Sequence, residues 1–147
     1  MRKEGFKLIG KALIRRIKDG KILDEEIVHN LVVNTGKERV AKLLGGVSTQ
    51  EFTSLAVGEG VTGALATDTE LESEVAEASA TVAYEADYMT TFEKTFTFGT
   101  AEEYDITEAG IFDGVGSGKV MFDRFTFSAK SVDVDTALYV KVTITVA

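Results

Sequence analysis

The closing stretch from Asp133 to Val146 most constrains the fold, because apolar and polar residues alternate along it. The apolar set is Leu138, Val140, Val142, Ile144 and Val146, and the set between them is Tyr139, Lys141, Thr143 and Thr145. Successive side chains of a β-strand point to opposite faces, so this period of two predicts a strand with one aliphatic face. We expect the strand to lie centrally in a sheet with that face directed inward.

A second stretch, from Asp105 to Phe127, predicts two strands joined by a turn. The turn, residues 114–118, contains three glycines between two apolar segments. Glycine adopts positive φ without strain, and a connection of this length is typical of a β-hairpin. The hairpin brings Glu108 near Arg124, and an arginine among apolar residues needs a carboxylate, so we predict a structural ion pair between them. The alternative is that Arg124 extends to solvent.

The remaining apolar patterns predict further strands. Residues 7–28 are expected to form a hairpin, because Asp19-Gly20 is a strong two-residue turn signal between two apolar segments. Single strands are expected at residues 52–57, 76–91 and 92–98. Short turns between so many strands favour antiparallel pairing.

Helix signals are few. Thr35 followed by Glu38 has the spacing of a capping box, and the apolar residues beyond it predict one short helix near 36–44. The same spacing in Thr67 and Glu70 indicates a single helical turn near 68–74.

These elements predict a mainly β protein, an antiparallel β-sandwich or jelly-roll-like barrel with one short α-helix near 36–44. The 147 residues suffice for one domain with a hydrophobic core, and we find no internal repeat. We divide the chain into a basic N-terminal β-hairpin or arm, 1–28, and a β-sandwich domain, 29–147, which together form one compact unit.

The charge distribution points to a protein partner. Residues 1–45 carry eleven basic and six acidic residues, a net charge of +5, so that the total of −8 leaves −13 for residues 46–147. Four basic residues cluster around the Asp19-Gly20 turn: Arg15, Arg16, Lys18 and Lys21. We predict that this tip binds an acidic surface of another protein or of a second copy. The alternative is a solvated strand face with no partner.

The sequence offers little support for catalysis or for cofactor binding. Residues 58–63 match GxGxxG, but a loop follows them instead of the long helix of a dinucleotide site. His29 is the only histidine and lies among apolar residues, which favours a structural role over that of a catalytic base. We therefore expect no enzyme activity, no catalytic residues and no cofactor.

Metal, nucleic-acid and membrane binding are not expected either. With one histidine and no cysteine the chain lacks an ordinary zinc site. Two acidic groups, Glu102-Glu103 with Asp105 and Asp133 with Asp135, could bind Ca²⁺ but lack the EF-hand spacing, so solvated loops are the default. The net charge of −8 disfavours nucleic acid, and no apolar run approaches the ~20 residues that span a membrane.

Several landmarks occur in an order that resembles a family. The first is Asn30-Leu-Val-Val-Asn34-Thr-Gly36 before the helix, followed by the Gly58-x-Gly60 turn and Asp68-Thr69-x-Leu71-x-x-Glu74. The others are Thr107-Glu-Ala-Gly-Ile-Phe-Asp113, Met121-Phe122-x-Arg124-x-x-Phe127 and the closing strand. In this order they resemble small structural proteins of tailed bacteriophages, of the head-decoration or tail-fibre-like group. The resemblance covers about residues 28–147.

The resemblance implies a virion component without catalysis, made in the host cytoplasm and placed on the capsid exterior. The length favours a decoration protein, which cements the major capsid protein and forms homo-oligomers, most often trimers. The first alternative is a tail or neck fibre module bound to another virion protein. The second is a small carbohydrate-binding β-sandwich, which would need Tyr84, Tyr88 and Tyr104 in one groove.

Overall fold

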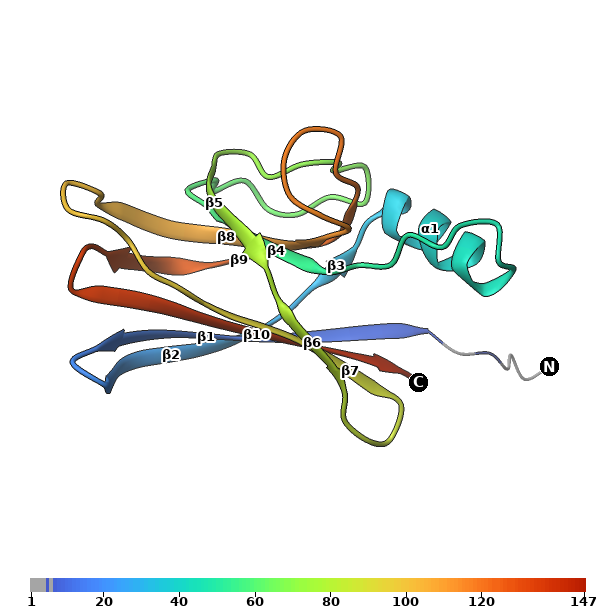
Figure 1. Cartoon of the computed structure of the whole chain (residues 1–147), viewed down its shortest axis with the longest axis horizontal. Coiled ribbons are helices and arrows are strands. Elements are labelled where there is room, and N and C mark those ends of the chain that lie inside the picture. The colour runs from blue at the N-terminus through green and yellow to red at the C-terminus, as the bar shows by residue number, and fades with distance from the viewer. Residues whose placement is uncertain (1–4, 6) are drawn as a thin grey trace.

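The computed structural model describes residue 5 and residues 7–147, which form two antiparallel five-stranded sheets packed as a β-sandwich (Figure 1). The order of sheet A is β2 (Lys21–His29), β1 (Leu8–Lys18), β10 (Thr136–Val146), β7 (Met89–Phe96) and β6 (Thr81–Tyr84). The order of sheet B is β3 (Leu31–Val32), β9 (Met121–Val132), β8 (Tyr104–Phe112), β4 (Ser54–Gly58) and β5 (Glu74–Ser79). The predicted mainly β fold is confirmed, and of the two expected architectures it is the sandwich, because the described strands form two separate sheets.

The main core lies between the sheets, and β10 occupies the middle of sheet A as predicted. Its residues Leu138, Val140 and Val142 are fully buried and belong to the same cluster as Leu55 and Ile111 of sheet B. The polar members of the alternation lie on the outer face. The period of two therefore gave both the strand and its orientation correctly.

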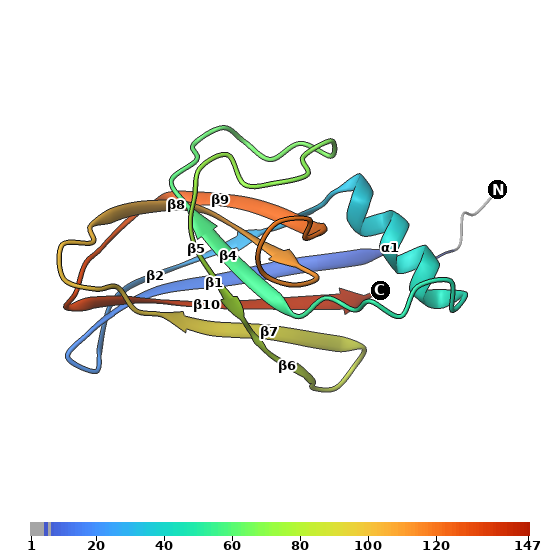
Figure 2. The same ribbon diagram turned by 45° about the horizontal axis from the view of Figure 1, so that its top comes forward.

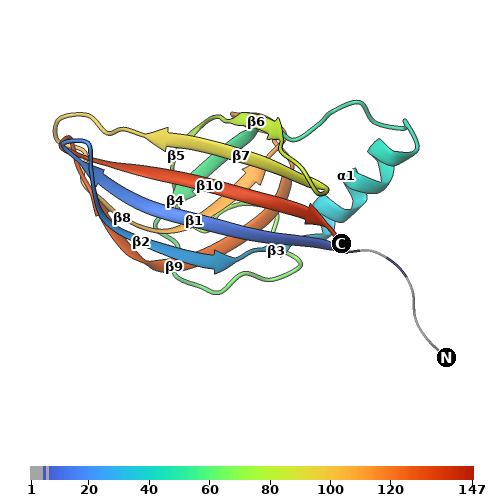
Figure 3. The ribbon, with the colours of Figure 1, turned by 90° about the horizontal axis from the view of Figure 1, so that it is seen from below.

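The N-terminal hairpin is part of this sandwich. β1 pairs with β10 along its whole length and with β2 on its other side (Figure 3). Its residues Ala12 and Ile14 are fully buried in the core. Asp19 and Gly20 join β1 to β2 with φ of 53° and 72°, the left-handed pair that a two-residue hairpin turn needs. The hairpin and the rest of the chain therefore pack as parts of the same sandwich.

The helix α1 (Asn34–Leu44) begins earlier than predicted and lacks the expected cap. Val33 occupies the N-cap position and makes no side-chain hydrogen bond. Thr35 lies inside the first turn, and its Oγ1 donates to the carbonyl oxygen of Met121 at 2.7 Å. Gly36 sits so close to β9 that a Cβ would lie 2.2 Å from the carbonyl oxygen of Phe122. The capping-box prediction is wrong because Thr35 bonds to a distant strand.

Two further predictions, between residues 68 and 91, are wrong. Residues 68–73 contain no helical turn, and β5 begins at Glu74. The strand expected over 76–91 is divided among three strands, because the chain leaves sheet B after Ser79, enters sheet A at Thr81 and turns back into β7 at Met89. At this crossing the amide of Ala80 donates to the carbonyl oxygen of Thr53 at 2.9 Å. Figure 1 shows the β6–β7 hairpin extending away from sheet B.

A smaller core lies on the outer face of sheet B, under the connection between β4 and β5, residues 59–73 (Figure 2). Its members are Val33, Ala56, Leu71, Phe112 and Met121. The predicted hairpin of residues 105–127 is confirmed as β8 and β9. Gly110 lets the two strands and the small core approach closely, since a Cβ there would lie 2.6 Å from the carbonyl oxygen of Asp123.

Candidate interaction surfaces

A buried carboxylate, Glu108 on β8, organises the outer face of sheet B. Its side chain is fully buried, and its two oxygens accept hydrogen bonds from the amides of Gly60, Glu72 and Ser73 at 2.7–2.9 Å. Arg124 on the paired strand β9 donates its Nε to Glu108 Oε1 at 3.0 Å. The contact that the sequence predicted is therefore present.

Arg124 extends this network to the connection of residues 59–73. Its guanidinium is almost fully buried and also contacts Asp68 Oδ2 at 3.1 Å and the carbonyl oxygen of Thr62 at 2.8 Å. Every N–H-bearing nitrogen of the guanidinium thus has an acceptor, which compensates the removal of its charge from water. We call Glu108, Arg124 and Asp68 the ionic site. Its contacts fix both ends of the 59–73 connection to sheet B.

The GxGxxG segment serves this site. A Cβ on Gly58 would lie 2.3 Å from the carbonyl oxygen of Ser73, and a Cβ on Gly60 would lie 2.4 Å from Glu108 Oε2. The glycines let the backbone approach the carboxylate, and Thr107 Oγ1 donates to the carbonyl oxygen of Gly60 at 2.6 Å. Packing against Glu108 accounts for the first two glycines of the segment, whereas a Cβ on Gly63 would meet nothing within 4 Å.

The four basic residues of the predicted partner-binding tip differ in their surroundings. Arg15 Nε lies 2.8 Å from Glu25 Oε2, and Arg16 Nη2 lies 2.7 Å from Asp24 Oδ2. The hydrogen bond from Arg16 holds the pKa of Asp24 below its usual value. Both arginines are thus paired with β2 of their own hairpin.

Lys18 and Lys21 flank the turn at the tip, where they face each other across the last rung of the hairpin. Both are exposed, and neither has an ion pair within the described residues. Residues 15–26 carry four basic side chains and four acidic ones, Asp19, Asp24, Glu25 and Glu26. The tip is therefore charge-balanced as a whole, and its available positive charge is concentrated on these two lysines.

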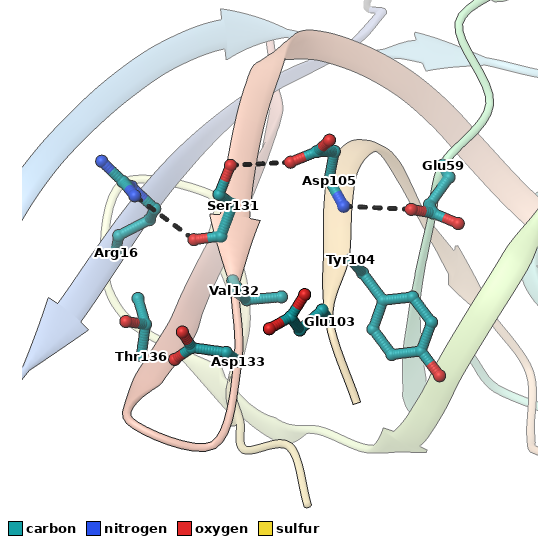
Figure 4. Close-up of a pocket in the computed structure, with 9 residues that line it drawn as sticks. All are labelled: Arg16, Glu59, Glu103, Tyr104, Asp105, Ser131, Val132, Asp133 and Thr136. Carbon is teal, nitrogen blue, oxygen red and sulfur yellow. Dashed lines mark hydrogen bonds between the residues drawn. The ribbon is translucent and has the colours of Figure 1, made fainter. Parts of the chain in front are cut away.

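A polar pocket of about 420 Å³ lies at the same end of the sandwich (Figure 4). Arg16 of β1, Asp105 of β8 and Ser131 of β9 face one another across it. Ser131 Oγ donates to Asp105 Oδ1 at 2.6 Å, and Arg16 Nη1 donates to the carbonyl oxygen of Ser131 at 3.3 Å. Glu59 accepts the amide of Asp105 at 3.0 Å. These contacts join β8 to β9, sheet A to sheet B, and the start of the 59–73 connection to β8.

Residues from both acidic groups considered for Ca²⁺ line the polar pocket, but they do not form one cluster. Glu102 Oε1 accepts a hydrogen bond from the amide of Gly99 at 2.6 Å, and Asp133 Oδ1 accepts one from the amide of Asp135 at 2.9 Å. In residue 5 and residues 7–147 we find no cluster of three side chains able to hold a metal ion. Glu102 and Asp133 thus each stabilise a turn of the backbone.

The outer face of sheet A carries a shallow groove of about 450 Å³. It is lined by β2, β1, β10 and β7, with the apolar residues Ile9, Leu13 and Ile27 beside the polar residues His29 and Lys141. Ile9 and Ile27 are 41% and 56% exposed. His29 is thus an exposed groove residue and does not lie in the core.

Beside the groove, polar residues cross the sheet in a row. The guanidinium of Arg15 lies 5.5 Å from the ring centre of Tyr139, whose hydroxyl donates to Glu93 Oε2 at 2.6 Å. Burial and the neighbouring Glu93 raise the pKa of Tyr139 to about 12. The row gives sheet A a polar strip on its outer face.

The three tyrosines of the carbohydrate-binding alternative do not form one groove. Tyr84 and Tyr88 are neighbours, with the amide of Tyr88 donating to the Tyr84 hydroxyl at 3.3 Å. Tyr104 packs on Phe98, beyond the other end of β7. Every residue from Thr81 to Tyr88 is exposed, which makes β6 the barest edge of sheet A. The sequence missed this edge because residues 76–91 were interpreted as one strand.

Comparisons with protein-family models, curated proteins and solved structures give no match for this chain. No helix in the described part of the chain has the length and apolar character needed to cross a membrane. The class that the geometry defines is thus a small β-sandwich with anchored loops and one bare sheet edge.

Proposed function

We propose that this chain is a structural protein of a tailed-phage virion, a decoration protein that binds the outside of the head and stabilises it. Copies of the chain associate with one another on the particle, next to the major capsid protein. The proposal assigns no catalytic step and no cofactor to the chain.

One observation carries this proposal: the landmarks of the phage resemblance coincide with the contacts that build the outer face of sheet B. Glu108 and Arg124 form the ionic site, and Asp68 completes it. The amide of Asn34 donates to the carbonyl oxygen of Ala66 at 2.8 Å, which joins α1 to the same connection. The residues that carry the resemblance therefore hold the outer face of sheet B together, and this supports the proposal.

A second contact of the same kind lies at Asp113, the last residue of the Thr107–Asp113 landmark. Arg39 of α1 lies 2.8 Å from Asp113 Oδ2, and the amide of Val120 donates to Asp113 Oδ1 at 2.7 Å. The helix is thereby fixed to the turn between β8 and β9. A rigid sandwich with fixed loops suits a protein that must hold neighbouring subunits in place.

The test is to locate the chain on virions from its source. Purified particles are labelled with a gold-conjugated antibody raised against the recombinant protein, and the label is located by electron microscopy. Label on heads supports decoration, and label on tails or necks supports the fibre alternative. Virions that carry no label while the lysate contains the protein would overturn both. A glycan array tests the carbohydrate-binding alternative, for which we expect no specific signal.

A further inference from the structure

We propose that β6 is a self-association edge, at which two copies of this chain pair antiparallel about a two-fold axis and join their A sheets. This inference concerns the isolated protein, and its test does not depend on the proposed place in a virion.

The two edges of sheet A differ in the way their strands are protected. β2 carries Lys21, Asp24, Glu25 and Glu26, and charges on an edge strand discourage pairing with other chains. Glu26 also accepts hydrogen bonds from the amide and hydroxyl of Ser128 on β9, which covers this edge. Pairing of β2 with another chain is therefore disfavoured by its charged residues and by its contact with β9.

β6 has none of these protections. No charged residue occurs from Ala78 to Tyr84, and no proline occurs in the chain. Val82 and Tyr84 are 43% and 67% exposed. An exposed and uncharged edge strand is a template for another strand.

The hydrogen-bond pattern of the β6–β7 hairpin shows which backbone groups of β6 are free to pair. The amide of Glu85 donates to the carbonyl oxygen of Met89 at 3.0 Å, and the hydroxyl of Thr91 donates to the carbonyl oxygen of Ala83 at 3.4 Å. Because bonded and non-bonded pairs alternate in an antiparallel ladder, Ala83 bonds toward β7. The backbone groups of Val82 and Tyr84 then point outward, toward the free edge.

These outward groups are self-complementary. In the two-fold arrangement Val82 of one copy lies opposite Tyr84 of the other, and each such pair exchanges two backbone hydrogen bonds. The apolar side chains meet as an aromatic and a β-branched residue, a favourable cross-strand pair. Ala83, with the smallest side chain, lies at the axis, so no like charges face each other across the axis.

The predicted assembly is a dimer, whereas the phage resemblance implies a trimer. A two-fold contact uses the same patch on both copies and closes with two of them. A four-residue strand alone gives an interface below the roughly 1,000 Å² of a stable complex, so the dimer is reversible and strengthens with concentration.

The first test traps the dimer with one cysteine. The chain has no cysteine of its own, so Ala83→Cys introduces a unique thiol beside the axis. Opposed residues of a non-hydrogen-bonded pair have Cα atoms about 4.5 Å apart, within the range of a disulfide. Under mild oxidation we expect a species of twice the 15.9 kDa monomer mass. The control is Thr95→Cys, exposed on the same face of β7, which should remain monomeric.

The second test uses charge. Ala83→Lys and Ala83→Glu each place two like charges at the axis and should each sediment as monomers at concentrations where the original protein dimerises. An equimolar mixture of the two variants should recover the dimer, because opposite charges then meet. Failure of Ala83→Cys to cross-link faster than Thr95→Cys would overturn the proposal. So would charge variants that dimerise as the original protein does, or an original protein that remains monomeric at every concentration.

Discussion

At the scale of single residues, Asp123 is the most unusual side chain in the main core. It is fully buried, accepts the amide of Ile111 at 2.8 Å and accepts a short hydrogen bond from Asn30 Nδ2. Burial raises its pKa from 3.8 to about 7, against the opposing effect of these two hydrogen bonds. A carboxyl whose pKa is higher in the folded state binds its proton more tightly there than in the unfolded chain. Its contribution to stability is thus greatest below pH 3.8 and is lost as the pH rises to about 7.

The first prediction concerns Asp123→Asn. An amide keeps an acceptor for Ile111 and can pair with Asn30, and it has no proton to lose. A rise in pKa from 3.8 to about 7 corresponds to on the order of 4 kcal/mol, so the variant should be more stable at pH 8 by up to this amount. Urea unfolding of both proteins at pH 5 and pH 8 measures the change. Equal pH dependence in the two proteins would show that Asp123 titrates normally.

The second prediction concerns Glu108→Gln. The substitution removes the buried carboxylate of Arg124, leaves only the partly exposed Asp68 as its ionic partner and weakens three backbone contacts, so the free energy of unfolding should fall by about 3–5 kcal/mol. Glu70→Gln, an exposed change in the same connection, is the control and should alter stability by less than about 0.5 kcal/mol. The two midpoints are compared by thermal unfolding. Similar midpoints would mean that the ionic site contributes little to stability.

At the scale of elements, the alternation in β10 permits a matched pair of substitutions. Val142 is fully buried between the sheets, whereas Thr143 lies on the outer face opposite Lys11. Val142→Asp places an unpaired charge in the core and should abolish cooperative unfolding. Thr143→Asp can pair with Lys11 and should change stability by less than about 1 kcal/mol. Circular dichroism with urea titration gives both results, and equal losses would contradict the register of β10.

The same scale shows where sequence information is sufficient and where it fails. β10 was predictable because one of its faces is buried and the other faces solvent, so that apolar and polar residues alternate along it with a period of two. Residues 76–84 are mostly small and give no period, so the crossing at Ala80 between the sheets left no signal. The Glu108–Arg124 pair could be predicted because both residues lie in one hairpin. The hydrogen bond between Asn30 and Asp123 could not be predicted, because it depends on the packing of β3 beside β9.

At the scale of the whole molecule, ion pairs join the two oppositely charged parts of the sequence. Arg39 pairs with Asp113, and Glu26 pairs with Lys130, so basic and acidic residues from distant positions neutralise one another. Arg16 also reaches β9 through the carbonyl oxygen of Ser131. Among the described residues, attachment through charge therefore depends on the cations that have no acidic partner, such as Lys18 and Lys21.

The last prediction identifies those cations at the tip as Lys18 and Lys21. Both are exposed beside the Asp19-Gly20 turn, and reversing both to Glu changes no buried contact. If the tip binds an acidic surface, the double variant should attach more weakly to virions stripped of the protein, and the affinity of the original protein should fall as salt screens the contact. The loss should be about ten-fold or less at low salt, because each exposed pair contributes only ~0–1 kcal/mol.

The control for this prediction is the double change Lys7→Glu and Lys37→Glu. Both residues are exposed, before β1 and in α1, at the opposite end of the sandwich, and the change in net charge is the same. Binding is measured by co-sedimentation at low and high ionic strength, with circular dichroism confirming that all three proteins are folded. A tip-specific loss that disappears at high salt supports the role of the two lysines. Equal losses in both variants would mean that only net charge matters, and unchanged binding would leave the tip as a solvated turn.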